Sequence, residues 1–186
     1  MPKTQKTPKA TKAPKAAKAP VAVVSEQEEP KMVAAIRIRG CVGVQYKIED
    51  TMKMLRLHHV NHATVLPWVP TVKGMLSRAK DYITYGPITP ELLEKLLTRR
   101  GRGPGNRRLT EEYLKEHTEF RDLKDLATAI YDGRVKLKDL KTIKPVFRLH
   151  PPKGGHRMGI KWPYAAGGTL GKVPAEFMEK LLMKMM

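Results

Sequence analysis

The sequence contains a single cysteine, Cys41, among its 186 residues. One thiol cannot form an intramolecular disulfide, nor a zinc site built from several cysteines. No apolar stretch approaches the roughly 18 residues of a membrane-spanning helix. The short apolar run Val21–Val24 falls well below the length of a secretory signal and is followed by glutamates. The sequence therefore predicts a protein of a reducing compartment, the cytoplasm, with no membrane partner.

Acidic residues are scarce, because 18 Asp and Glu stand against 36 Lys and Arg, which gives a formal net charge of +18. Residues 140–175 contain seven cations and no acid, and the first 25 residues contain six lysines and no acid. Such an excess of one sign repels itself unless a polyanion neutralises it. Nucleic acid is the polyanion that most often binds such chains, so we expect RNA as the partner.

The first 31 residues consist mostly of Lys, Ala, Pro and Thr. Such a composition offers almost no apolar area to bury, and its prolines disfavour a helix. We expect a disordered basic arm. Two roles stay open for this arm: a solubilising tail, or an electrostatic arm that lies along phosphates.

Residues 32–86 show a β-α-β-α-β pattern. Strands are predicted for Val33–Arg39, Ala63–Leu66 and Tyr82–Tyr85, and helices for Tyr46–Leu57 and for the segment that Thr71 caps. Three strands with two helices on one face form a two-layer α/β core of the ferredoxin-like kind. In the first strand, Ile36 and Ile38 are expected to face the core.

Alternation in that first strand places Arg37 and Arg39 on the opposite face, which could meet phosphate or water, and we favour solvent for both arginines. The adjacent Cys41 has no histidine beside it, so a small buried side chain is its expected role.

The second half of the chain is predicted to be a helical extension, residues 87–140, followed by a basic strand-loop segment, residues 141–186. The extension opens with Thr89 and Pro90, breaks at a glycine-rich stretch, and resumes in a short helix after Thr110 and in a helix over Asp122–Tyr131. The run Pro145–His150 is strand-like and leads into a glycine-rich loop.

Two basic stretches are the candidate RNA-binding sites. Arginine forks bind phosphates, and glycines let the main chain approach them. The first stretch has glycines but no Gly-Lys-Ser/Thr ending, so nucleotide hydrolysis is unsupported. Aromatic rings at positions 147, 162 and 164 offer faces for unpaired bases, although packing on the core is favoured for them. The candidate residues are Arg99, Arg100, Arg102, Arg107 and Arg108 in the first stretch and Lys144, Arg148, Lys153, Gly154, Gly155, His156, Arg157 and Lys161 in the second.

His58, His59 and His62 form the only histidine cluster. No Glu stands at the second position as in a zinc protease, and a helix end followed by a turn explains the cluster better than a metal site does. Nothing in the sequence assembles a catalytic triad or an acid/base pair. We therefore expect no catalytic residues, no metal and no cofactor.

Separated motifs in a fixed order resemble the L-thirty family of large-subunit ribosomal proteins. They are Ile36–Gly40, Thr51 with Leu55–Leu57, Val72–Leu76 with its Gly74-Met75 pair, Tyr82–Tyr85, the run Phe147–Gly155, and Gly167-Gly168 before a C-terminal helix that begins near Pro174. The segment beyond Pro87 resembles the archaeal and eukaryotic branch, in which the eukaryotic protein is called L-seven. The resemblance covers residues 32–186.

This resemblance implies a structural constituent of the large ribosomal subunit that binds rRNA near the 5S rRNA and contacts neighbouring ribosomal proteins. It implies no enzyme and no obligate homo-oligomer. An assembly or pre-rRNA processing factor of the same fold is the first alternative. A metal-dependent nuclease that uses the histidines and a nonspecific DNA-compacting protein are more distant alternatives.

Overall fold

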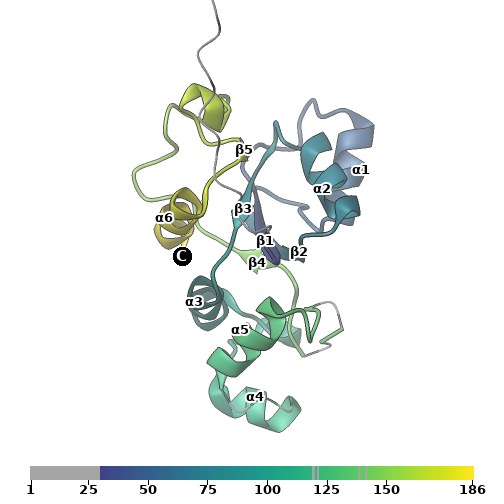
Figure 1. Ribbon diagram of the computed structural model, residues 1–186, viewed down its shortest axis with the longest axis vertical. Coiled ribbons are helices and arrows are strands. Elements are labelled where there is room, and N and C mark those ends of the chain that lie inside the picture. Colours follow the sequence, from purple (N-terminus) through teal and green to yellow (C-terminus); the bar gives the residue numbers. More distant parts are fainter. Residues whose placement is uncertain (1–29, 119, 121, 138, 141) are drawn as a thin grey trace, which may run out of the picture.

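A computed structural model describes residues 30–118, 120, 122–137, 139–140 and 142–186. Its centre is a mixed five-stranded sheet in the order β4-β2-β1-β3-β5 (Figure 1). Strand β1 pairs antiparallel with both β2 and β3, β4 joins β2 antiparallel, and β5 joins β3 in parallel. The strands are β1 Met32–Arg37, β2 His62–Pro67, β3 Ile83–Pro87, β4 Phe147–Arg148 and β5 Gly171–Lys172. Apart from Pro30 and Lys31, the predicted basic arm lies outside the described residues.

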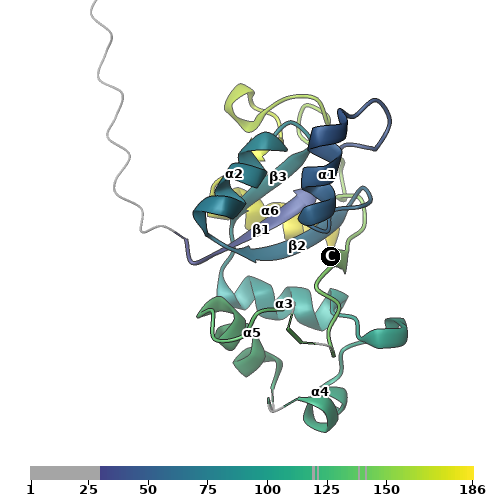
Figure 2. The ribbon, with the colours of Figure 1, turned by 90° about the vertical axis from the view of Figure 1, so that its right-hand side faces the viewer.

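Helices α1 (Tyr46–Met54) and α2 (Pro70–Arg78) cover one face of the sheet (Figure 2). Their buried side chains pack against the odd-numbered residues of β1, Val33 and Ala35. The order β1-α1-β2-α2-β3 confirms the predicted ferredoxin-like core. Helix α2 begins at Pro70, whose fixed φ suits the first helical position, and therefore starts one residue before the predicted cap, Thr71.

The other face of the sheet is covered too. Helices α3 (Pro90–Arg100) and α6 (Ala175–Met185) bury their leucines and methionines against the even-numbered residues of β1 and against Ala63 and Val65 of β2. Helix α5 (Leu123–Tyr131) packs on α3. Helix α4 (Glu111–His117) adds Leu114 to the same cluster. Burial on both faces explains why β1, unlike a surface strand, is buried at every position.

The expectation that Arg37 faces solvent is wrong. Its side chain lies on the face covered by α1 and α2, and the residue is only 2% exposed. A charge buried this far is stable only if its donors are satisfied. The guanidinium donates to the main-chain carbonyl oxygens of Arg39, Leu57, His58 and Gly40, at 2.8–3.0 Å.

The expectation for Cys41 is also wrong, because its thiol is exposed in the loop between β1 and α1. Of the three aromatic residues considered for base stacking, Phe147 is fully buried and Tyr164 packs edge-on against Phe177, which confirms core packing for these two. The indole of Trp162 is exposed.

Candidate nucleic-acid interface

The last turn of α6 joins the two basic stretches that the sequence singles out. From the second stretch, the N–H of His150 donates to the carbonyl of Met185 (2.9 Å) and the N–H of Lys153 to that of Lys184 (3.1 Å). From the first stretch, Nη2 of Arg100 donates to the main-chain oxygen of Met186 (2.5 Å). These bonds bring segments about 50 residues apart in the chain onto one helix end.

The first stretch is a small hairpin that follows α3. Arg102 and Arg108 form an antiparallel bridge, and Gly103 N–H donates to the carbonyl of Arg107 (2.9 Å), around the short helix η1 (Pro104–Asn106). The N–H of Lys144 donates to the carbonyl of Arg102 (2.8 Å), so the second stretch begins beside this hairpin. The pairing fixes the backbone, while Arg99, Arg107, Arg108 and Lys144 stay exposed.

Arg100 differs from its neighbours. Its guanidinium is half-buried and bonded to Met186, and burial, together with the charges of Arg102 and Arg99, lowers its pKa. Its position predicts a role in holding α3 to α6. Sequence reasoning has no signal for this contact, because the two partners lie 86 residues apart.

Strand β4 separates a core residue from a surface residue. Phe147 is fully buried, and the next residue, Arg148, is exposed opposite His62 of β2. Burial, aided by the charges of His59, Arg148, His58 and Arg37, lowers the pKa of His62 to about 4. His62 is therefore neutral at pH 7. Among the described residues, no group of three or more His, Cys, Asp or Glu side chains is placed to hold a metal ion.

Beyond β4 the chain forms an open basic loop. Lys153, Gly154, Gly155, Arg157 and Lys161 are exposed. Gly154 and Gly155 have positive φ. Beyond their chain neighbours, no atom lies within 4 Å of the place where a Cβ would stand, so their main chain is open to a ligand. His156 is half-buried, and burial lowers its pKa.

A concave space of about 500 Å³ lies between this loop and α6. Arg157 lines it from the loop, and Lys180 and Lys184 line it from the helix, together with Glu176. Sequence reasoning missed the two lysines because they belong to an amphipathic helix whose charged face is ordinary in composition. Only the contact between loop and helix places these two lysines beside the basic loop.

None of the candidate cations pairs with an acidic residue that the structure describes. In the part of the chain that the structure describes, ion pairs involve Lys31, Lys53, His117 and Arg134, and none of the candidate RNA-binding residues. We define the basic surface as the exposed cations among them: Arg99, Arg107, Arg108, Lys144, Arg148, Lys153, Arg157 and Lys161. Unpaired cations on a rigid scaffold are suited to bind phosphates.

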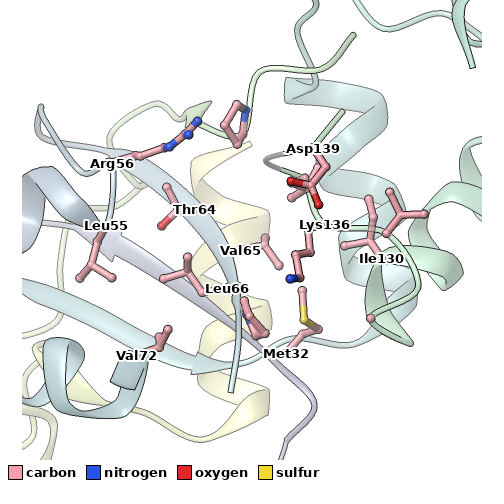
Figure 3. Close-up of a pocket in the computed structure, with 15 residues that line it drawn as sticks. Met32, Leu55, Arg56, Thr64, Val65, Leu66, Val72, Ile130, Lys136 and Asp139 are labelled. Atoms are coloured by element: carbon pink, nitrogen blue, oxygen red, sulfur yellow. The ribbon is translucent and has the colours of Figure 1, made fainter. Parts of the chain in front are cut away.

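An apolar cavity of about 400 Å³ lies elsewhere, beside the outer edge of β2 (Figure 3). Val65, Leu66 and Ile130 line its wall, with Arg56, Lys136 and Asp139 among its few charged residues. It holds neither a nucleophile with a base beside it nor a convergent set of metal ligands. The cavity therefore offers no catalytic arrangement.

The structure defines a small α/β protein with a ferredoxin-like core and an exposed basic surface, and comparison with known proteins identifies its family. Residues 33–83 match the family model described as ribosomal protein L30p/L7e. The chain is 49% identical over 154 residues to large ribosomal subunit protein uL30 of Archaeoglobus fulgidus, which covers 83% of this chain and 99% of that protein.

Two further relatives with the same name agree. The protein of Methanococcus maripaludis (strain C5) is 51% identical over 82% of this chain and 98% of its own, and that of Methanosphaera stadtmanae is 46% identical over 83% and 99%. The chain belongs to the ribosomal protein L30p/L7e family, in its archaeal type. This confirms the family that the sequence motifs indicated, and it agrees with the expectation of a non-enzymatic protein. In the described residues, no helix has the length and apolar character to cross a membrane.

Proposed function

We propose that this chain is a structural component of the large ribosomal subunit and that the basic surface binds large-subunit rRNA. The observation that carries the proposal is the convergence of two acid-free basic stretches at the end of α6, whose cations form no ion pair with the acidic residues that the structure describes. Each cation that meets a phosphate releases condensed counterions, which favours binding.

The relatives' printed name, large ribosomal subunit protein uL30, supports the location of this rRNA in the large subunit. We place the contact near the 5S rRNA, with other ribosomal proteins as neighbours, in the cytoplasm. The protein acts there as a single copy held by RNA, without a cofactor.

Sedimentation of a native lysate, with a high-salt wash, tests the proposal. One copy per mature large subunit that survives the wash is the expected result. Presence only in precursor particles would favour an assembly or pre-rRNA processing factor, and absence from all ribosomal fractions would refute both.

The basic surface itself is tested by replacing Arg148, Lys153 and Arg157 with Ala in the full chain. The slope of log affinity for deproteinised large-subunit rRNA against log salt should fall in magnitude by about three, roughly one for each lost phosphate contact. The melting temperature should stay unchanged, because these three side chains are exposed and unpaired.

A matched control removes the same charge elsewhere. Lys95, Lys115 and Lys124 are exposed on α3, α4 and α5, among acidic neighbours. Their triple Ala variant should keep the wild-type slope within about one unit. Equal slopes for the two triple variants would show that net charge alone, and no particular surface, binds the RNA.

A further inference from the structure

One stretch of the basic segment exposes apolar side chains that the binding of phosphates leaves unexplained. Met158, Ile160 and Trp162 are 61%, 44% and 53% exposed. Arg157 directly precedes Met158, and Lys161 lies between Ile160 and Trp162. Both cations are exposed as well. Large apolar groups in water cost free energy unless a partner covers them, so this stretch, residues 157–162, is a candidate contact.

The backbone holds Trp162 in place while its indole stays exposed. The carbonyl oxygen of Trp162 accepts hydrogen bonds from the N–H groups of Thr169 (3.1 Å) and Leu170 (3.2 Å). A Cβ at position 168 would lie 2.0 Å from that oxygen, so the two segments approach this closely only because residue 168 is glycine. A ring presented on a fixed backbone loses little freedom on binding.

The turn that precedes it is also constrained. The N–H of Gly159 donates to the carbonyl of His156 (3.1 Å), and Met158 adopts a left-handed conformation with φ of 51°. A methionine in this conformation is held by its surroundings at a cost in free energy, a pattern that clusters at binding sites. The exposed stretch is thus shaped before a partner arrives.

The charge of the stretch decides which partner it fits. An apolar groove of another protein suits Met158, Ile160 and Trp162 but leaves Arg157 and Lys161 without counter-charges. Unpaired nucleotides supply both a flat apolar face and a phosphate on either side. Residues 140–175 contain no acid that would repel them.

We infer that Trp162 stacks on an unpaired base of the rRNA, while Arg157 and Lys161 bind the phosphates that flank that base. The inference rests on the proposed function and adds the kind of nucleotide that this stretch binds. Base–indole stacking depends on the ring, whereas the phosphate contacts depend on charge, so the two are separable by experiment.

The test uses the full chain and deproteinised large-subunit rRNA. Trp68→Phe leaves Trp162 as the only indole, because the sequence has two tryptophans. Stacking should quench its fluorescence by more than half on binding. In filter binding, Trp162→Ala should weaken the affinity about 5- to 150-fold, the factor that one base–aromatic stack implies.

Two controls identify the interaction. Trp162→Phe keeps a ring and should stay within about threefold of the wild type. Arg157→Ala should reduce the salt slope by about one, whereas Trp162→Ala should leave it unchanged.

Wild-type affinity of Trp162→Ala with an unquenched indole would overturn the inference and leave rRNA binding intact. An indole that responds only to added ribosomal proteins would overturn it in favour of a protein partner. Failure of the wild type to bind the rRNA would instead refute the proposed function.

Discussion

The central strands and the basic segment use the same residue types in opposite ways. Arg37 of β1 is buried, and its guanidinium donates hydrogen bonds to four main-chain carbonyls. Arg148 of β4 is exposed and has no acidic partner among the described residues. The strands of the core run to five or six residues, but β4 and β5 have two each. The core thus satisfies its own polar groups, and the basic segment leaves its charges for another molecule.

The largest effect is expected from Arg37→Ala. It removes four hydrogen bonds from a charged donor and leaves buried carbonyls unpaired, so the free energy of unfolding should fall by about 3–5 kcal/mol. Urea denaturation measures this change in the free energy of unfolding. Arg39→Ala is the control. Arg39 is partly exposed, donates one hydrogen bond to the Asp81 carbonyl and lies over the Tyr82 ring, and its loss should cost about 1 kcal/mol or less. Similar losses of stability for both variants would contradict the contrast between the buried Arg37 and the partly exposed Arg39.

Strand β4 allows the comparison within two adjacent residues. Phe147→Ala empties a fully buried site and should destabilise the protein by about 3–5 kcal/mol. Arg148→Ala should change stability by less than about 0.5 kcal/mol and yet weaken rRNA binding. Thermal melts and filter binding on both variants measure the two effects, and a destabilised Arg148→Ala would show that this arginine belongs to the core.

A smaller effect is expected at the glycine that closes the loop on Trp162. Gly168→Ala places a Cβ against the Trp162 carbonyl, and the main chain must shift, at roughly 1–3 kcal/mol. Gly74→Ala is the matched control, because position 74 is helical and open, and Ala there should stabilise α2 by up to about 1 kcal/mol. Equal melting temperatures for the two variants would contradict the close approach.

The smallest effect concerns pH. His62 has its pKa lowered from 6.5 to about 4 by burial and neighbouring cations, so the unfolded chain binds a proton more readily between these values. Stability from this group is complete above pH 6.5 and is lost as the pH falls towards 4, by roughly 1–2 kcal/mol once solvent screening is allowed for. In urea titrations at pH 7 and 4.5, His62→Gln should show a smaller loss than the wild type. Equal losses of stability between pH 7 and 4.5 for the wild type and His62→Gln would argue against a lowered pKa at His62.

The sequence predicts the core well because its signals are local. Apolar spacing within each segment defines β1, α1, β2, α2 and β3, and those elements appear in the predicted order. The exposure of Arg148 and Lys153 also agrees with expectation, since no acid lies nearby in the chain. Their role in RNA binding stays a prediction.

The errors come from contacts between distant segments. Alternation of Ile and Arg in β1 predicts that one face of the sheet is exposed to solvent. Instead, helices from both halves of the chain cover both faces. The turn after α1 buries Arg37. Likewise, the bond from Arg100 to Met186 depends on how α3 and α6 meet. No periodicity within one segment contains this information.

The short outer strands have a consequence for a chain that has not yet met its RNA. A long exposed strand edge pairs readily with the same edge of another copy and starts aggregates. Here β4 covers only His62 and Ala63 of β2. The remainder of that strand faces the apolar cavity, which is also lined by Leu137 and by Pro145, a residue with no N–H to offer. On the other side, β5 pairs with only two residues of β3 before Pro174 ends it. The sheet therefore offers little template for self-association, which suits a basic protein that must stay dispersed until it is incorporated.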